Sequence, residues 1–304
     1  MSAVTVPSVV PDEGEGVGVA ARLRSRVARG RGALRGRGYL VWVFVLLVIA
    51  AFAVFGDLLA PIDPALQAPR DRLLGPMSST DSGLHVFGTD QLGRDLFGRV
   101  IVGTRLTVVI ALASMVAGSL VGTAAGLVAG FYGGPVDRLV SRVAEAQTAM
   151  PMFLIAILLV SLVGASVVNL VIVLPTLVWP SFARIVRAET LRLRQAGFME
   201  AAVVVGGSNG WIMGRHLLPN LATRIVTLTV VSTGQVILAE AGLSFLGAGV
   251  QAPDTTWGLL VSTGREYLAV AWWLTIVPGV FLVLTVLALN MLGRRYTDDR
   301  GAAA

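Results

Sequence analysis

Residues 106–131 read LTVVIALASMVAGSLVGTAAGLVAGF, a run of 26 residues without a single charge. A helix of about 20 mostly apolar residues crosses the roughly 30 Å hydrocarbon core of a bilayer, so the run predicts a transmembrane helix. Its glycines recur every four residues, at Gly118, Gly122, Gly126 and Gly130. Because glycine lets two helix backbones approach closely, we interpret this stripe as a helix-packing face, with a solute-lining face as the alternative.

The rest of the chain repeats this pattern and predicts an all-α membrane protein of six transmembrane helices. The other apolar runs cover approximately residues 39–60, 152–168, 170–185, 222–246 and 271–292. The third and fourth runs form one long apolar stretch, which is interrupted by Gly164, Ser166 and Asn169, and the interruption favours a tight helical hairpin. Pro175 and Pro180 each remove a helix hydrogen bond, so we expect the fourth span to be kinked or partly irregular.

Composition excludes several kinds of chemistry. Of 304 residues, 55% are hydrophobic and 14% are charged, whereas about a quarter of a soluble domain is charged. There is no cysteine and there are only two histidines, so thiolate chemistry, disulfides and cysteine-rich or histidine-rich metal sites lack their ligands. All 24 basic residues are arginine, and a P-loop needs a lysine to reach the nucleotide phosphates. We therefore expect no metal, no cofactor and no ATP hydrolysis in this chain.

The arginines predict the orientation, because cytoplasmic flanks carry the excess of positive charge. With both termini inside, 18 arginines lie on the inner side and 6 on the outer side. The predicted organisation has five parts. They are a cytoplasmic basic arm (1–38), an anchor helix (39–60), an extracytoplasmic segment (61–105), a core of five transmembrane helices (106–293) with a large inner loop at about 187–220, and a cytoplasmic tail (294–304).

Two segments outside the spans leave alternatives open. We interpret the basic arm as a flank that orients a retained anchor rather than as a cleaved signal peptide; contact with anionic lipid or with nucleic acid are weaker alternatives, and we expect no nucleic-acid partner. The outer segment, residues 57–104, is rich in Pro, Gly and Asp. It is equally consistent with a docking surface for another protein and with a plain structured loop.

The large inner loop carries the most informative motif. It reads Glu200-Ala201-Ala202, three residues, Gly206, nine residues, and then His216-Leu217-Leu218-Pro219-Asn220. We expect a short helix at the membrane surface around Glu200, with Gly206 either extending a small-residue face or ending the helix in a left-handed turn. The spacing resembles the EAA loop of ABC-importer permeases, Glu-Ala-Ala, three residues, Gly, nine residues, Ile-x-Leu-Pro. His216 replaces the Ile, as is usual in the dipeptide, oligopeptide and nickel importer branch.

Two further segments resemble the C-type subunits of that branch. One is His85 to Arg105, containing Gly-Thr-Asp-Gln-Leu-Gly-Arg-Asp, and the other is Ala239 to Gly247 with the later Trp257-Gly258. The resemblance implies a type I importer permease in the bacterial cytoplasmic membrane, forming half of the pathway for di- or oligopeptides. It also implies a second homologous permease, two cytoplasmic ATPases that bind ATP and Mg, and an extracytoplasmic solute-binding protein. By analogy the ATPase-coupling residues are Glu200, Ala201, Ala202, Gly206, His216, Leu218 and Pro219; the alternative is a loop that merely links two spans.

Glu240 is an ionisable residue inside an apolar run, and such residues are often functional because burying them is costly. It lies close to the predicted outer interface, so we expect a solvated or locally hydrogen-bonded carboxylate, with a pathway or outer-gate role as the alternative. A self-sufficient secondary transporter or channel is the competing class of function, but no pair of interrupted inverted segments supports it. Importers of nickel chelates or glutathione remain alternatives to a peptide importer.

Overall fold

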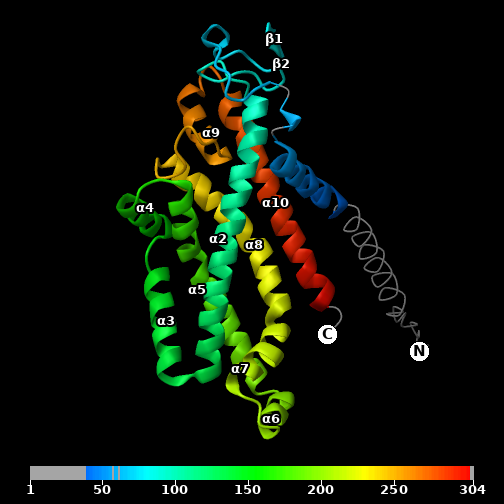
Figure 1. Ribbon diagram of the computed structural model, residues 1–304, viewed down its shortest axis with the longest axis vertical. Coiled ribbons are helices and arrows are strands. Elements are labelled where there is room, and N and C mark those ends of the chain that lie inside the picture. The colour runs from blue at the N-terminus through cyan, green and yellow to red at the C-terminus, as the bar shows by residue number, and fades with distance from the viewer. Residues whose placement is uncertain (1–38, 57, 61, 302–304) are drawn as a thin grey trace, which may run out of the picture.

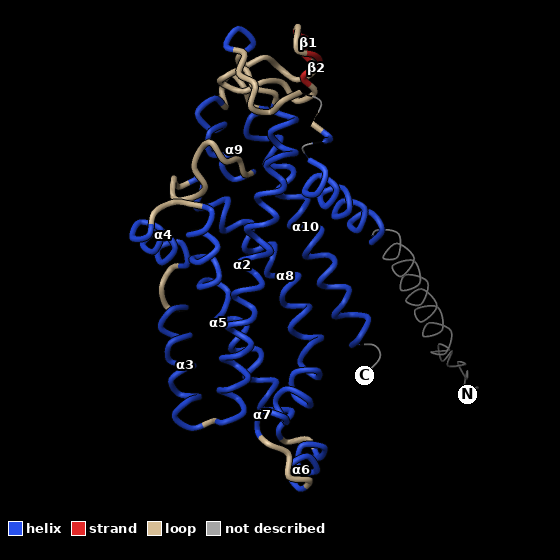
Figure 2. Tube along the Cα trace, in the orientation of Figure 1, coloured by secondary structure: helices blue, strands red, loops and turns tan. Residues whose placement is uncertain are grey.

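The computed structural model describes residues 39–56, 58–60 and 62–301, and the predicted basic arm lies outside them. Figure 2 shows long helices through most of the molecule, with loops and two short strands at one end. The helices are Tyr39–Gly56, α2 (Leu96–Tyr132), α3 (Gly134–Thr148), α4 (Met152–Val163), α5 (Val167–Arg194), α6 (Gly197–Val204), α7 (Asn209–Ile212), α8 (Leu218–Phe245), α9 (Trp257–Gly264) and α10 (Trp273–Gly301). The short elements are the 3-10 helices η1 (Pro69–Asp71) and η3 (Arg265–Tyr267), the π-helix η2 (Met213–Leu217), and the strands β1 (Ser78–Thr80) and β2 (Gly83–His85).

Within the described residues, five helices are long and apolar enough to cross a membrane. These spans are Tyr39–Gly56, Leu96–Tyr132, Val167–Arg194, Asn209–Phe245 and Trp273–Arg295. Helices α3 and α4 pass the same test only as a pair bent by 93°, which is either a broken sixth span or a re-entrant segment. The all-α membrane architecture expected from the apolar runs is therefore confirmed.

The second span begins ten residues earlier than the apolar run predicts. Helix α2 starts at Leu96, where the Asp95 carboxylate caps it by accepting a hydrogen bond from the Gly98 backbone N–H at 2.7 Å. Hydropathy places the start too late because Arg99 lies in the first turns. The structure buries Arg99 and pairs its guanidinium with Asp90 Oδ2 at 2.6 Å. The end of the predicted extracytoplasmic segment is thus already helical.

The predicted third span over residues 152–168 is wrong as a single helix. Helix α4 has only 12 residues, about 18 Å of length, and ends at Gly164, whose φ of 89° breaks the helix. The preceding α3 carries charged residues that lower its hydropathy, and it passes the span test only together with α4. One of them, Asp137, accepts hydrogen bonds from Arg187 of α5 at both carboxylate oxygens. This ion pair fastens α3 to α5.

The turn between α4 and α5 is built by the residues that interrupt the apolar run. Ser166 caps α5 by accepting a hydrogen bond from the Asn169 backbone N–H at 3.1 Å. The Asn169 side-chain amide donates in turn to the carbonyls of Val163 at 2.7 Å and Gly164 at 3.0 Å. These bonds satisfy carbonyls that the end of α4 leaves open, and they produce the expected hairpin.

Helix α5 runs as one helix through both of its prolines, so the fourth span is not partly irregular, and a kink at the prolines stays a prediction. Pro180 has no N–H for the carbonyl of Thr176, four residues earlier. The side-chain amide of Gln147, at the end of α3, donates a hydrogen bond to that carbonyl instead. The Gln147 Oε1 atom accepts a hydrogen bond from Trp179 Nε1 at 2.8 Å. A neighbouring helix therefore supplies the donor that the proline removes.

The glycine stripe of α2 lies against α5, and no other pair of elements packs as extensively among the described residues. A Cβ atom at Gly122 would lie 2.5 Å from the carbonyl oxygen of Trp179, and one at Gly126 would lie 2.4 Å from that of Ala183. At Gly118 and Gly130 an added Cβ would also come within 3.0 Å of α5 side chains or backbone. The stripe thus brings the two helix backbones together.

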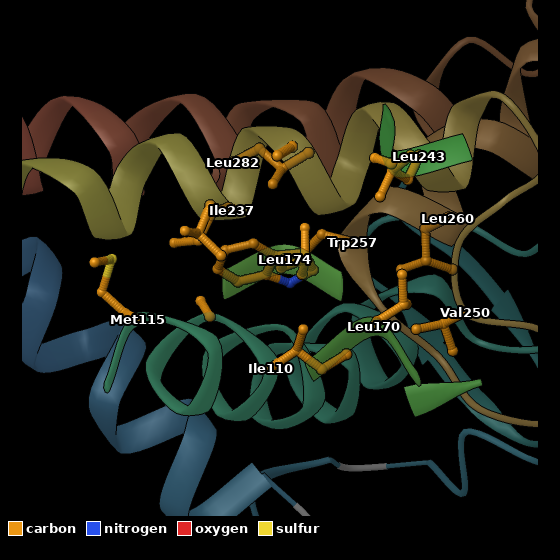
Figure 3. Packing of buried hydrophobic residues seen from close by; sticks show 14 of the residues in the cluster. Ile110, Met115, Leu170, Leu174, Ile237, Leu243, Val250, Trp257, Leu260 and Leu282 are labelled. Carbon is orange, nitrogen blue, oxygen red and sulfur yellow. The ribbon is translucent and has the colours of Figure 1, made fainter. Parts of the chain in front are cut away.

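One apolar core joins α2, α5, α8, α9 and α10 (Figure 3). Trp257, at the start of α9, is fully buried there. Its indole Nε1 donates to the Val100 carbonyl at 3.0 Å, and its backbone N–H donates to Thr107 Oγ1 at 3.1 Å. The same cluster also contains Ile110, Met115, Leu170, Leu174, Ile237, Leu243, Val250, Leu260 and Leu282.

The outer segment folds onto the ends of α2 and α10 rather than standing apart (Figure 1). Strands β1 and β2 form an antiparallel hairpin with Ser78 opposite His85. The buried His85 Nδ1 atom lies 2.9 Å from Asp95 Oδ1, at the N-cap of α2. Trp273 of α10 donates from Nε1 to the Thr89 carbonyl at 3.3 Å. The segment is therefore a structured cap, and whether a partner docks on it stays a prediction.

Candidate functional site

The Glu-Ala-Ala motif lies on α6, at the end of the molecule opposite β1 and β2 and beyond the turn that joins α2 to α3 (Figure 1). Met199 is 5% exposed and Ala202 is 7% exposed, and both pack into a small apolar cluster separate from the main core. Its other buried members are Val186, Leu193, Ile212, Leu217 and Leu221. The short helix is thus seated on the bundle by its own apolar side chains. The structure describes no side-chain placement for Glu200 and Ala201.

Burial changes the role expected for Ala202. The resemblance implied that it contacts an ATPase, but its side chain faces the cluster that holds α6 to α5 and α8. A small residue at this position lets α6 lie close to the bundle. Ala202 therefore helps to position the motif helix, and its contact with an ATPase stays a prediction.

Gly206 ends α6 in a left-handed turn, which decides between the two roles that the sequence left open. Its φ is 82°, and no heavy atom lies within 4 Å of where its Cβ would be. The backbone N–H of Gly207 donates to the Ala202 carbonyl at 3.1 Å. This bond closes the turn in the Schellman pattern, in which glycine is preferred because it has no Cβ.

Gly207 matters as well, although the motif did not single it out. A Cβ atom there would lie 2.9 Å from the Ala202 carbonyl oxygen and 2.8 Å from the Trp211 ring. The doublet Gly206-Gly207 was visible in the sequence, and two adjacent glycines are a strong turn signal. Gly206 provides the backbone conformation, and Gly207 provides the space into which Trp211 folds back.

The tip of this turn exposes apolar side chains beyond the membrane-spanning helices. Val204 is 86% exposed and Val205 is 82% exposed. Phe198 and Trp211, at 41% and 47% exposed, lie on the neighbouring helices α6 and α7. We call these four residues the α6 tip. Single exposed apolar residues are ordinary, but four of them within 14 consecutive residues make this segment a candidate interaction surface.

The second half of the motif forms the entry into α8. His216 lies in η2 with its ring edge against Trp211, the ring centroids being 4.6 Å apart. Its carbonyl accepts a hydrogen bond from the Asn220 side chain at 2.6 Å. Leu218 is 41% exposed and Pro219 occupies the first turn of α8, where a missing N–H does no harm. The π-helix η2 continues into α8 without a break, so the second half of the motif is part of the same helical segment as a candidate membrane span.

Glu240 is far from this surface, at the outer end of α8. Its side chain is 1% exposed, so the carboxyl group is buried and not solvated. Its Oε1 atom accepts hydrogen bonds from Ser244 at 2.8 Å and from Thr256 at 2.9 Å. Since Thr256 also caps α9 by accepting from the Leu259 N–H at 3.2 Å, Glu240 joins α8 to α9. The local hydrogen bonding is as expected, and a gating role stays a prediction.

Comparison with known proteins places this geometry in a family. Residues 122–298, which include α6 and the whole motif, match the family of binding-protein-dependent transport system inner membrane components. The chain is 38% identical over 256 residues, 83% of each chain, to the dipeptide transport system permease protein DppC of Alkalihalophilus pseudofirmus. It is 38% identical over 257 residues, 84% of this chain and 83% of the relative, to the glutathione transport system permease protein GsiD of Pectobacterium atrosepticum. It is 35% identical over 264 residues, 86% and 87% of the two chains, to the di/tripeptide transport system permease protein DppC of Pseudomonas aeruginosa.

These matches argue against a self-sufficient transporter or channel, because the family consists of components of larger transport systems. They agree with the resemblance drawn from the spaced motifs. The chain belongs to the family of binding-protein-dependent transport system inner membrane components, as a membrane-spanning permease subunit of an ABC importer.

Proposed function

We propose that this permease carries di- or oligopeptides and that the α6 tip couples it to a cytoplasmic ATPase. The names of its relatives support the substrate class, since two are dipeptide or di/tripeptide permeases and the third transports glutathione, itself a tripeptide. The observation that carries the coupling role is the α6 tip, an apolar surface on a short helix outside the membrane-spanning bundle. Nickel chelates are the less supported substrate, because none of these three relatives is named for them.

The complete importer that we propose has five protein components. Two are permeases, this chain and a homologous second one, and two are cytoplasmic ATPases that bind ATP and Mg. The fifth is an extracytoplasmic binding protein that delivers the solute. The absence of lysine from this chain supports the assignment of ATP hydrolysis to the partners, because a P-loop requires that residue.

We also propose that both termini are cytoplasmic, which puts α6 on the ATPase side of the membrane. The support is the 18 to 6 division of arginines, which the opposite topology would reverse. A reporter fused after Ala304 should respond as cytoplasmic, and one inserted after Asp63 should respond as extracytoplasmic. If both reporters respond from the same side, the orientation and the six-crossing arrangement are wrong together.

The coupling role predicts what happens when the α6 tip becomes polar. In the double variant Val204→Asp, Val205→Asp, ATPase subunits should no longer copurify with the tagged permease, while its amount in the membrane stays at the wild-type level. Each buried valine is worth about 1.5 kcal/mol or more, so losing both weakens binding by roughly 100-fold. Both side chains are exposed in the isolated chain, so folding is spared.

A matched control separates lost apolar contact from added charge. Asn209→Asp places a negative charge in the same loop, at an exposed position in the first turn of α7 where a carboxylate is favourable. It removes no apolar surface, and the ATPases should remain bound. Wild-type copurification with the double valine variant would show that the α6 tip is not the coupling surface.

A further inference from the structure

A groove lies on the side of the bundle between α4, α5 and α8. Its volume is about 390 Å³, which lies in the range of small-molecule sites. Most of its wall is apolar, and no charged residue lines it. The apolar lining consists of Met152, Phe153, Leu174, Leu177, Val178, Val236, Leu238 and Ala239.

Three polar side chains interrupt this wall. Ser181 comes from α5, and Ser232 and Gln235 come from α8. None of the three makes a side-chain hydrogen bond to the part of the chain that the structure describes. Gln235 is also exposed, so its amide projects from the helix instead of packing into the core.

The depth of these residues makes their lack of partners significant. Gln235 lies ten residues before the end of α8, about 15 Å along the helix axis. Ser181 lies 14 residues after the start of α5, about 21 Å along it. Both positions fall well inside a hydrocarbon core roughly 30 Å thick. Moving an unpaired amide or hydroxyl from water into an apolar medium costs about 2–7 kcal/mol. We therefore infer that the groove faces a polar medium or a polar ligand instead of lipid.

We propose that this groove is the chain's own wall of the solute pathway, and that Gln235, with Ser181 and Ser232, hydrogen-bonds the backbone amides of a peptide in transit. This inference rests on the proposed function and deepens it by naming a contact site. A glutamine amide and two hydroxyls offer neutral donors and acceptors, which complement peptide bonds. Without a charged group, the groove holds neither terminus of the peptide strongly, which suits passage better than retention.

Cysteine accessibility tests the location, and the chain's lack of cysteine makes the test clean for this subunit. In the assembled importer in membranes, Gln235→Cys should react with a water-soluble thiol reagent, and a transported dipeptide such as alanyl-alanine should slow the reaction. Val283→Cys is the matched control, since Val283 is an exposed apolar residue on α10, which does not line the groove. It should not react.

Substitutions at the same position test the chemistry. Gln235→Met keeps the size of the side chain and removes its hydrogen bonds, so dipeptide uptake should fall while membrane level and ATPase copurification stay unchanged. Gln235→Glu adds a negative charge at the groove. It should raise the uptake of alanyl-lysine relative to alanyl-aspartate, a shift that a purely structural residue would not produce.

The outcomes separate this inference from the proposed function. If the wild-type importer takes up dipeptides but Gln235→Cys is unreactive and instead crosslinks to the second permease, the groove is a packing surface and the inference is overturned. If Gln235→Cys reacts but the wild-type importer takes up no peptide, the groove is a pathway and the peptide assignment fails. Unchanged uptake and an unchanged uptake ratio in the Met and Glu variants would overturn the contact role of Gln235.

Discussion

Gly126→Leu should remove the protein from the membrane fraction almost completely. An added Cβ at this position lies 2.4 Å from the carbonyl oxygen of Ala183 and 3.0 Å from its Cα. These are backbone atoms of α5, so no side chain can rotate away, and α2 must separate from α5. Overpacking in a tight interface costs about 1–3 kcal/mol and sometimes more. Here a whole leucine side chain must fit where there is no room for a Cβ, so we expect a destabilisation of about 3 kcal/mol or more.

The measurement is the amount of protein in washed membranes by immunoblot, together with the thermal unfolding midpoint of any protein that survives in detergent. The matched control is Ala124→Leu, two residues earlier on the exposed side of α2. It adds a comparable side chain toward the outside and should leave both values near wild type. If Gly126→Leu has a normal membrane level and a normal unfolding midpoint, α2 and α5 do not pack as closely as the distances to Ala183 indicate.

Gly206→Leu should have the second largest effect, and on transport instead of assembly. The φ of 82° at Gly206 is unfavourable for any residue with a Cβ, by about 1–2 kcal/mol. The turn that presents Val204 and Val205 therefore changes shape, and the leucine side chain enters the open space that we assign to the ATPase. Membrane levels should stay near wild type, while dipeptide uptake falls by about tenfold or more and substrate-stimulated ATP hydrolysis is lost.

Two controls identify the cause. Gly206→Asn should retain more uptake than Gly206→Leu, because asparagine tolerates the left-handed region better than other residues with a side chain. Gly210→Leu adds the same bulk at another open glycine of the loop, one without a left-handed φ, and should be mild. Unchanged uptake in Gly206→Leu would show that this loop does not transmit the ATPase movement.

Much of the membrane architecture could be predicted from the sequence because long apolar runs have few alternatives to spanning a bilayer. The errors arose where a charged or polar group has a partner that the hydropathy pattern does not reveal. Arg99 hid the start of α2, since its charge lowers the hydropathy and Asp90 is not visible as its partner. The charged residues of α3 hid its pairing with α4 for the same reason. Pro180 was expected to disturb α5, but the compensating donor comes from Gln147, 33 positions earlier.

For the candidate site too, the sequence predicted the features that depend on local chemistry and missed those that depend on the fold. Local chemistry was enough to predict the Glu-Ala-Ala motif on a short helix and to offer a left-handed turn at Gly206 as one of two roles, between which the structure decided. The sequence could not show that Ala202 faces inward, that Glu240 is buried, or that Val204 and Val205 stand exposed. The groove residues were the least predictable. Ser181 and Gln235 look like ordinary polar positions in separate apolar runs until the fold brings α5 and α8 together.

The contact between Trp273 and Thr89 has a consequence for the order of events during synthesis. These residues are 184 positions apart, and the neighbouring Phe87 ring packs against Phe281 of α10 at a centroid distance of 6.4 Å. In the orientation that we propose, the cap segment is synthesised early and reaches the extracytoplasmic side before most of the helices are made. Its final fold nevertheless requires the last helix to be inserted. The cap therefore closes last, and a chain truncated before α10 should expose it unfinished to the proteases outside the membrane.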